Sequence, residues 1–71
     1  MTQLELVKLL NAEGPLSASA IAGYVEEPVT SMYRYLHRAL AFGWVRRVKS
    51  SGHWMYSVTD QGRAYIDYKK P

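Results

Sequence analysis

Hydrophobic positions follow a helical period over the first 42 residues and a shorter, β-like pattern after them. Apolar residues first recur every three to four positions, which is typical of amphipathic helices. After residue 43, two runs are rich in β-branched and aromatic residues, which favours strands. The pattern therefore predicts helices over residues 3–12, 18–25, 29–42 and 60–68, and strands over residues 44–49 and 54–58.

Capping residues support the helix boundaries. Thr2 with Glu5 three positions later fits a capping box, and Gly14-Pro15 stops the first helix. Ser17 and Thr59 are the predicted N-caps of the second and last helices.

Turn-forming residues separate the other elements. Glu26-Glu27-Pro28 forms a turn before the third helix, and we expect the two glutamates to be structural rather than catalytic. Gly43 is expected to end that helix in a left-handed conformation. The stretch 50–53, Ser-Ser-Gly-His, is predicted to join the strands into a β-hairpin, and Leu16 to pair with one of them.

The periodicity also predicts which side chains are buried. We expect Trp54, Tyr56 and Val58 to share one face of the hairpin and to pack on the helices, and Ala64, Tyr65 and Tyr68 to cover its base. Lys69-Lys70-Pro71 is expected to be a basic, frayed end. The predicted inward faces of the first three helices are Leu6, Val7, Leu9 and Leu10; Ile21, Ala22 and Val25; and Met32, Leu36, Ala39 and Leu40.

The third helix has a polar face opposite its apolar stripe. At 100° per residue this face gathers small hydroxyls, arginines and an imidazole, with Tyr33 on its flank. Arginine pairs with guanine in a bidentate manner, and Ser and Thr hydroxyls bind bases or phosphates. The alternative is a solvated face of a core helix. The residues of this face are Thr30, Ser31, Arg34, His37 and Arg38.

The charge is unevenly distributed. Residues 28–59 contain five Lys or Arg and both histidines but no Asp or Glu, whereas the rest of the chain has four Lys or Arg against six acids. We call residues 28–59 the basic window. A polyanion is attracted to one side of such a molecule, and the window includes the polar face of the third helix.

Composition limits the other classes. The 71 residues predict one domain, 1–71, and 48% hydrophobic residues suffice for a core. No run reaches the roughly 18 apolar residues of a membrane span, the N-terminus does not fit a signal peptide, and we expect a cytoplasmic protein. No cysteine, phosphate loop, paired carboxylates or serine-activating motif is present, and two histidines are too few for a metal site. We therefore expect no catalytic residue, no metal and no cofactor.

Helix, short strand, helix, turn, helix, hairpin and helix is the order of an α+β winged helix-turn-helix domain, with a three-helix core, a β-hairpin wing and a C-terminal helix. The stretch ASAIAGYVEEPVTSMYRYLHRALAFGWVRR resembles the helix-turn-helix of MarR-like bacterial regulators, in which a glycine, two apolar residues and arginines follow the recognition helix. Residues 56–63, YSVTDQGR, resemble the end of that family's wing. The family's long flanking helices and ligand pocket have no counterpart, so we predict no small-molecule ligand.

The resemblance implies sequence-specific binding of double-stranded DNA by a small transcriptional regulator. The recognition helix would enter the major groove, with Arg34 reading bases, Thr30 and Ser31 on bases or phosphates, and His37, Arg38 and Tyr33 on the backbone. The wing would lie along the backbone or in the minor groove. Its predicted DNA-binding residues are Arg47, Lys49, Ser51, Gly52 and His53, although the pattern leaves open which of Arg46 and Arg47 faces DNA.

Two alternatives compete with this interpretation. The domain would serve as a protein–protein adaptor, which an exposed Trp54 would favour, or it would bind RNA or a replication origin. Because one winged helix contacts little DNA, we also expect a homodimer, through the first or last helix with Tyr65 and Tyr68, or cooperative assembly on DNA.

Overall fold

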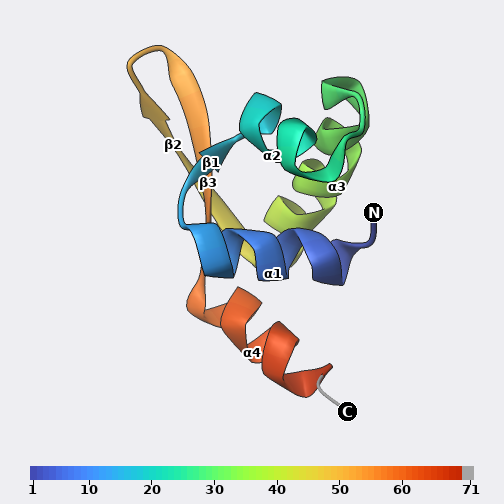
Figure 1. Ribbon diagram of the computed structural model, residues 1–71. Helices are drawn as coiled ribbons and strands as arrows, with labels where there is room; N and C mark the ends of the chain where they lie inside the picture. Colours follow the sequence, from blue (N-terminus) through green and yellow to red (C-terminus); the bar gives the residue numbers. More distant parts are fainter. Residues whose placement is uncertain (70–71) are drawn as a thin grey trace.

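The computed structural model describes residues 1–69; Lys70 and Pro71 of the predicted basic end lie outside the described residues (Figure 1). All predicted elements are present in the predicted order, which confirms the α+β winged helix-turn-helix arrangement. The helices are α1 (Gln3–Glu13), α2 (Ala18–Val25), α3 (Val29–Phe42) and α4 (Asp60–Tyr68), and the strands are β1 (Leu16–Ser17), β2 (Val45–Ser50) and β3 (His53–Val58).

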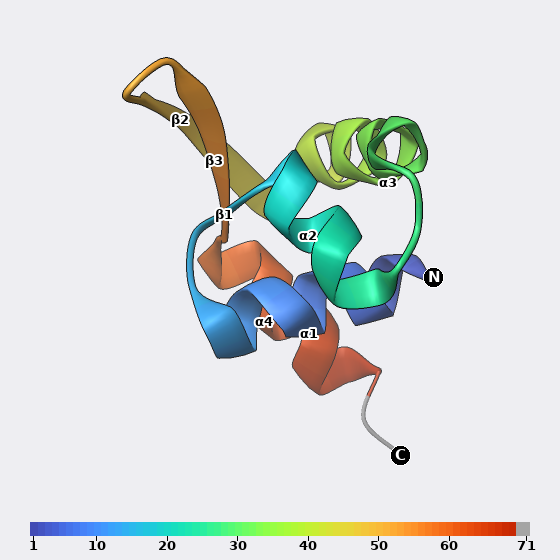
Figure 2. The same ribbon diagram turned by 45° about the horizontal axis from the view of Figure 1, so that its top comes forward.

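The three strands form one antiparallel sheet in the order β1-β3-β2. Leu16 pairs with Tyr56, as predicted, so the short β1 covers one edge of β3 near the helices. Beyond β1, the β2–β3 hairpin extends past the helices. In both views its tip lies on the same side of the molecule as α3, with α4 on the opposite side (Figures 1 and 2).

The hairpin turn is shorter than predicted. Ser50 pairs with His53, so only Ser51 and Gly52 form the turn, and both strands include one of the residues assigned to it. Ser51 has φ 50° and Gly52 φ 81°. Positive φ at both positions is the geometry of a two-residue turn whose twist matches that of the flanking strands.

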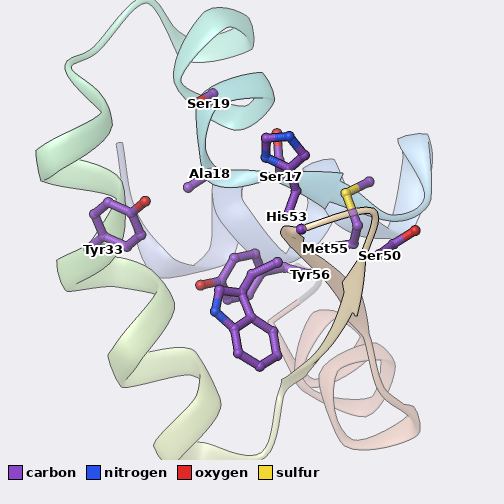
Figure 3. Close-up of a pocket in the computed structure, with 10 residues that line it drawn as sticks. Ser17, Ala18, Ser19, Tyr33, Ser50, His53, Met55 and Tyr56 are labelled. Carbon is purple, nitrogen blue, oxygen red and sulfur yellow. The ribbon is translucent and has the colours of Figure 1, made fainter.

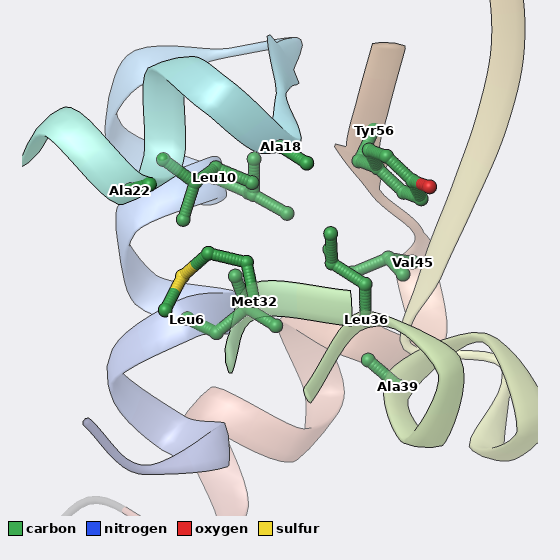
Figure 4. Packing of buried hydrophobic residues seen from close by; sticks show 10 residues of the cluster. Leu6, Leu10, Ala18, Ala22, Met32, Leu36, Ala39, Val45 and Tyr56 are labelled. Carbon is green, nitrogen blue, oxygen red and sulfur yellow. The ribbon is translucent and has the colours of Figure 1, made fainter. Parts of the chain in front are cut away.

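The hydrophobic core lies between α1, α2, α3 and the base of the hairpin (Figure 4). Most of the predicted inward positions are buried, while Leu9, Val25 and Leu40 are partly buried at its margin. Tyr56 is the largest fully buried side chain and brings the hairpin into contact with the helices. The buried cluster consists of Leu6, Leu10, Ala18, Ile21, Ala22, Met32, Leu36, Ala39, Val45 and Tyr56.

Two burial predictions are wrong. Trp54 shares a face with Tyr56 and Val58 but is 43% exposed, because the hairpin carries it beyond the helices. On α4, Tyr65 stacks on Trp44 at the hairpin base as expected, with ring centroids 3.8 Å apart. Ala64 and Tyr68, however, lie on the exposed side of α4, and Gly62 and Ile66, one helical turn apart, face inward instead.

The predicted caps are confirmed. Thr2 and Glu5 form both hydrogen bonds of the capping box, and the hydroxyls of Ser17 and Thr59 accept bonds from the first turns of α2 and α4. Gly43 ends α3 with φ 79°, the left-handed conformation expected of it.

The turn between α2 and α3 is held by its own backbone and by one ion pair. Glu26 caps α2 in the left-handed region at φ 56°. The carboxylate of Glu27 lies 3.1 Å from the amino group of Met1, whose side chain is buried.

A hydrogen bond also links α2 to the end of α1. The Tyr24 hydroxyl donates it to the Glu13 carboxylate over 2.8 Å. This bond, together with the charge of Glu13, raises the pKa of Tyr24.

The hairpin base and α4 are in close contact at Gly62. A Cβ atom there would lie 2.1 Å from the carbonyl oxygen of Trp44 and 2.6 Å from Val58 Cγ2. The Trp44 carbonyl also accepts a hydrogen bond from the N–H of Thr59, so it is not free to move away.

We predict that Gly62→Ala destabilises the fold by about 1–3 kcal/mol, because the added methyl group must displace backbone. Gly23→Ala is the matched control, since it is also a helical glycine but has open space around it. There we expect no loss, or a gain of up to about 1 kcal/mol from the better helix former. Urea unfolding followed by circular dichroism measures both variants; equal stabilities would contradict the prediction.

Candidate nucleic-acid interface

The polar face of α3 is exposed along most of its length. Thr30, Arg34, His37 and Arg38 are exposed, opposite a stripe of buried side chains on the same helix. Ser31 is only half-buried, on the margin of the face, and its N–H donates to the carbonyl of Pro28. The structure therefore brings the predicted residues of α3 onto one surface, with Ser31 at its edge.

Tyr33 lies on the flank of α3 that faces the hairpin. Its side chain is 44% exposed, and its ring centroid lies 6.3 Å from that of His37, one turn further along. At 100° per residue, Ser31 and Arg38 fall on the opposite flank. The α3 surface therefore has a hairpin side and a far side.

The hairpin register separates the two consecutive arginines. Val45, Arg47 and Lys49 pair with Val58, Tyr56 and Trp54, and directly paired residues share a face of the sheet. Arg46 therefore lies on the opposite face, with Val48. Since Tyr56 is buried against the helices, Arg47 and Lys49 lie on the helix-facing side of the hairpin.

The same register brings Arg47 and Lys49 against Trp54. The Arg47 guanidinium carbon is 4.4 Å, and the Lys49 ammonium 5.6 Å, from the centre of the indole ring. Both lie within the range of cation–π attraction, which orients the two side chains. Ser51, Gly52 and His53 are exposed at and beside the tip.

A cavity of about 430 Å³ separates α3 from the hairpin. Figure 3 shows Tyr33 projecting into it from α3, with Ser19 at the start of α2 and His53 on the hairpin around it. Of the predicted site residues, Tyr33, Gly52 and His53 line the cavity, whereas Arg34 and Arg38 do not.

Opposite charges are segregated in the structure. Within residues 1–69, none of the five Lys and Arg side chains of the basic window forms an ion pair with a carboxylate. The ion pairs in this range join Met1 to Glu27 and Arg63 to Asp60, and neither includes a cation of the window. The exposed side of α3 and the hairpin therefore has uncompensated positive charge.

Residues 1–69 contain no group of three His, Cys, Asp or Glu side chains placed to hold a metal ion. In the same range, every helix is too short or too polar to cross a bilayer.

Besides Tyr33, Gly52 and His53, the cavity is lined by residues that sequence reasoning did not assign to the site. Among them are Trp54, which it assigned to the core, and Ser17 and Ser19. The sequence signal for the exposure of Trp54 was the pair Ser51-Gly52. If these two residues are taken as the whole turn, Trp54 pairs with Lys49 near the tip of the hairpin, far from the strand ends that contact the core.

A helix-turn-helix followed by a hairpin next to the recognition helix defines a winged helix-turn-helix protein, and the fold is MarR-like. Over 93% of the chain it superposes on oxidised MarR from E. coli with a TM-score of 0.86, at 17% sequence identity. YusO from Bacillus subtilis gives a TM-score of 0.86 over 92% at 22% identity, and the E. coli MarR mutant C80S complexed with operator DNA gives 0.86 over 93% at 16%. The chain spans about half the length of these proteins, 48–49%. No protein-family profile and no curated protein sequence matches it.

We predict opposite effects of substitution at the two turn residues. Ser51→Asn should stabilise the hairpin by a few tenths to about 1 kcal/mol, because asparagine adopts positive φ more readily than serine. Gly52→Ala should cost about 1 kcal/mol although nothing lies within 4 Å of the added methyl, because alanine is strained at φ 81°. Amide hydrogen exchange in β2 and β3 measures both; equal protection in the two variants would contradict the prediction.

Proposed function

We propose that this chain binds double-stranded DNA sequence-specifically, as a small transcriptional regulator of the cytoplasm rather than an enzyme. The observation that carries the proposal is spatial. α3 and the hairpin lie on one side of the molecule (Figure 2), and the cations on them form no ion pair within residues 1–69. A duplex presents a groove for a helix beside a phosphate backbone, which fits this pairing of surfaces.

In this proposal α3 lies in the major groove. Arg34, on the middle of the exposed face, reads a guanine, and Thr30 at the N-terminal end contacts a base or phosphate. Ser31 and Arg38, on the far flank, contact one backbone strand, and Tyr33 and His37, on the hairpin side, contact the other.

The wing supplies contacts outside the major groove. Arg47 and Lys49 neutralise phosphates, and Ser51, Gly52 and His53 at the tip lie along the backbone or in the minor groove. Arg46, on the opposite face of the hairpin, has no contact in this arrangement.

Similar proteins support the proposal by analogy. The structures that share this fold include a MarR mutant complexed with operator DNA and the transcriptional regulator Tm0710 from Thermotoga maritima. Because a shared fold does not fix function, the site residues of this chain must carry the argument.

We expect Arg34→Ala to weaken binding to a selected duplex about 10- to 100-fold, the range of one bidentate base contact. Fluorescence anisotropy with labelled duplex enriched from a random pool measures the loss. Arg63→Ala is the matched control, because it removes the same side chain from α4, on the other side of the molecule, where Arg63 pairs with Asp60. Its affinity should stay close to that of the wild type.

The salt dependence tests the number of phosphate contacts in the same experiment. With Arg38, Arg47 and Lys49 on phosphates, log K should fall with log[salt] at a slope of about −3. Arg34→Ala should lose more affinity on the selected duplex than on random duplex. A folded protein that binds neither duplex at low salt would refute the proposal.

An adaptor for a partner protein is the second candidate, and the exposed Trp54 favours it. Exposed aromatic side chains often anchor protein interfaces. Here, however, two cations lie against the Trp54 ring. No acidic residue lines the cavity beside it, and the aliphatic part of the lining is limited to Met55 and Ala18. An adaptor would bind its partner protein in the absence of DNA, and Arg34→Ala would leave that affinity unchanged.

We also propose that two copies assemble on DNA, as a homodimer or cooperatively. Tyr68 is 82% exposed on α4, and Phe42, which stacks on Trp44, is 57% exposed. Phe42 is the last residue of α3, and Trp44 in turn stacks on Tyr65 of α4, so an interface here would leave the N-terminal part of α3 and the hairpin tip free.

A further inference from the structure

The cavity between α3 and the hairpin has aromatic walls. Tyr33 forms the α3 side, Trp54 and Tyr56 the hairpin side, and His53 and Ser19 lie around them (Figure 3). Tyr56 is buried, whereas Tyr33 and Trp54 are 44% and 43% exposed. Their exposed surfaces face a space of about 430 Å³, which is large enough for one nucleotide-sized group.

Three hydrogen-bond donors around this space have no partner in the described chain. The Tyr33 hydroxyl, the Ser19 hydroxyl and the Trp54 indole N–H make no hydrogen bond within residues 1–69. All three donate hydrogen bonds, and phosphate oxygens accept them.

The charge around the cavity is complementary to an anion. No Asp or Glu lines it, and Arg47 and Lys49 lie against the ring of Trp54, 4.4 and 5.6 Å from its centre. Attraction to the ring keeps both cations beside the cavity even without a ligand, so less side-chain entropy is lost when an anion binds.

We propose that this cavity receives one sugar–phosphate unit of the DNA backbone, with the deoxyribose between Tyr33 and Trp54 and the phosphate at Arg47 and Lys49. The inference rests on the proposed function and adds two aromatic side chains as positioning residues. Because Tyr33 belongs to α3 and Trp54 to the wing, one backbone unit held between them sets how deeply the helix enters the groove.

An unpaired base is the other group that such walls would stack. The duplex backbone is favoured because the aromatic surfaces lie beside α3, at the position where a backbone strand borders the groove that the helix occupies.

Trp54 fluorescence tests the inference directly. The chain has two tryptophans, so in Trp44→Phe the emission reports Trp54 alone, and phenylalanine keeps an aromatic ring between Phe42 and Tyr65. On titration with unlabelled duplex we expect the Trp54 emission to shift and quench, with the same midpoint as anisotropy on labelled duplex. If Trp44→Phe does not fold, the difference in quenching between wild type and Trp54→Phe gives the same quantity.

Affinity provides the second measurement. Trp54→Ala should weaken duplex binding about five- to tenfold, the effect of losing an aromatic contact, while Trp54→Phe retains most of the affinity. Val48→Ala is the matched control, because Val48 is 50% exposed on the opposite face of the same hairpin. It should bind like the wild type.

The outcomes separate the two proposals. Duplex binding by anisotropy with unchanged Trp54 emission and unchanged Trp54→Ala affinity would overturn the cavity assignment and leave DNA binding standing. Tighter binding and stronger quenching with a single-stranded oligonucleotide would overturn it in favour of an unpaired base. Absence of binding to any nucleic acid would refute the proposed function itself.

Discussion

The structure depends on the contact between Gly62 of α4 and the carbonyl group of Trp44. This carbonyl accepts the N–H of Thr59, and the absence of a side chain at Gly62 allows α4 to pack directly against it. Gly43, the residue before Trp44, ends α3 in a left-handed conformation and redirects the chain. The end of α3, the start of β2 and the end of β3 are therefore joined in one place, and the direction of the hairpin relative to α3 is fixed there.

This junction explains how so short a chain presents two surfaces together. The buried ring of Tyr56 seats the base of the hairpin on the helices, while the distal half, with Lys49, Trp54 and the Ser51-Gly52 turn, extends beyond the core. Residues of the distal half are exposed and contribute little to the core, which leaves them free to contact a ligand. At 16–22% identity to the similar structures, the fold is preserved.

Local signals predicted most of the fold. The caps could be predicted because Thr2, Ser17 and Thr59 accept hydrogen bonds from residues only three positions away. The apolar stripe of α3 could be predicted because it depends only on the helical period. The predictions that failed or stayed open depend on contacts between residues far apart in the sequence. The burial of Trp54 depends on how far the hairpin extends past the helices. The choice between Arg46 and Arg47 depends on the strand register and on which face of the hairpin packs against the helices. The polar face of α3 was predictable, whereas the cavity beside it was not, because Tyr33, Ser19 and Trp54 come from three elements.

Chemical-shift mapping of the ¹⁵N-labelled protein with a DNA duplex tests the central claim most directly. We predict perturbations concentrated on α3 from Thr30 to Arg38 and on the hairpin from Arg47 to Trp54. On a duplex short enough to hold one copy, α1 and α4 should be largely unchanged. Perturbations centred on α1 and α4, or none at low salt in a folded sample, would contradict the assignment of α3 and the wing as the DNA-binding surface.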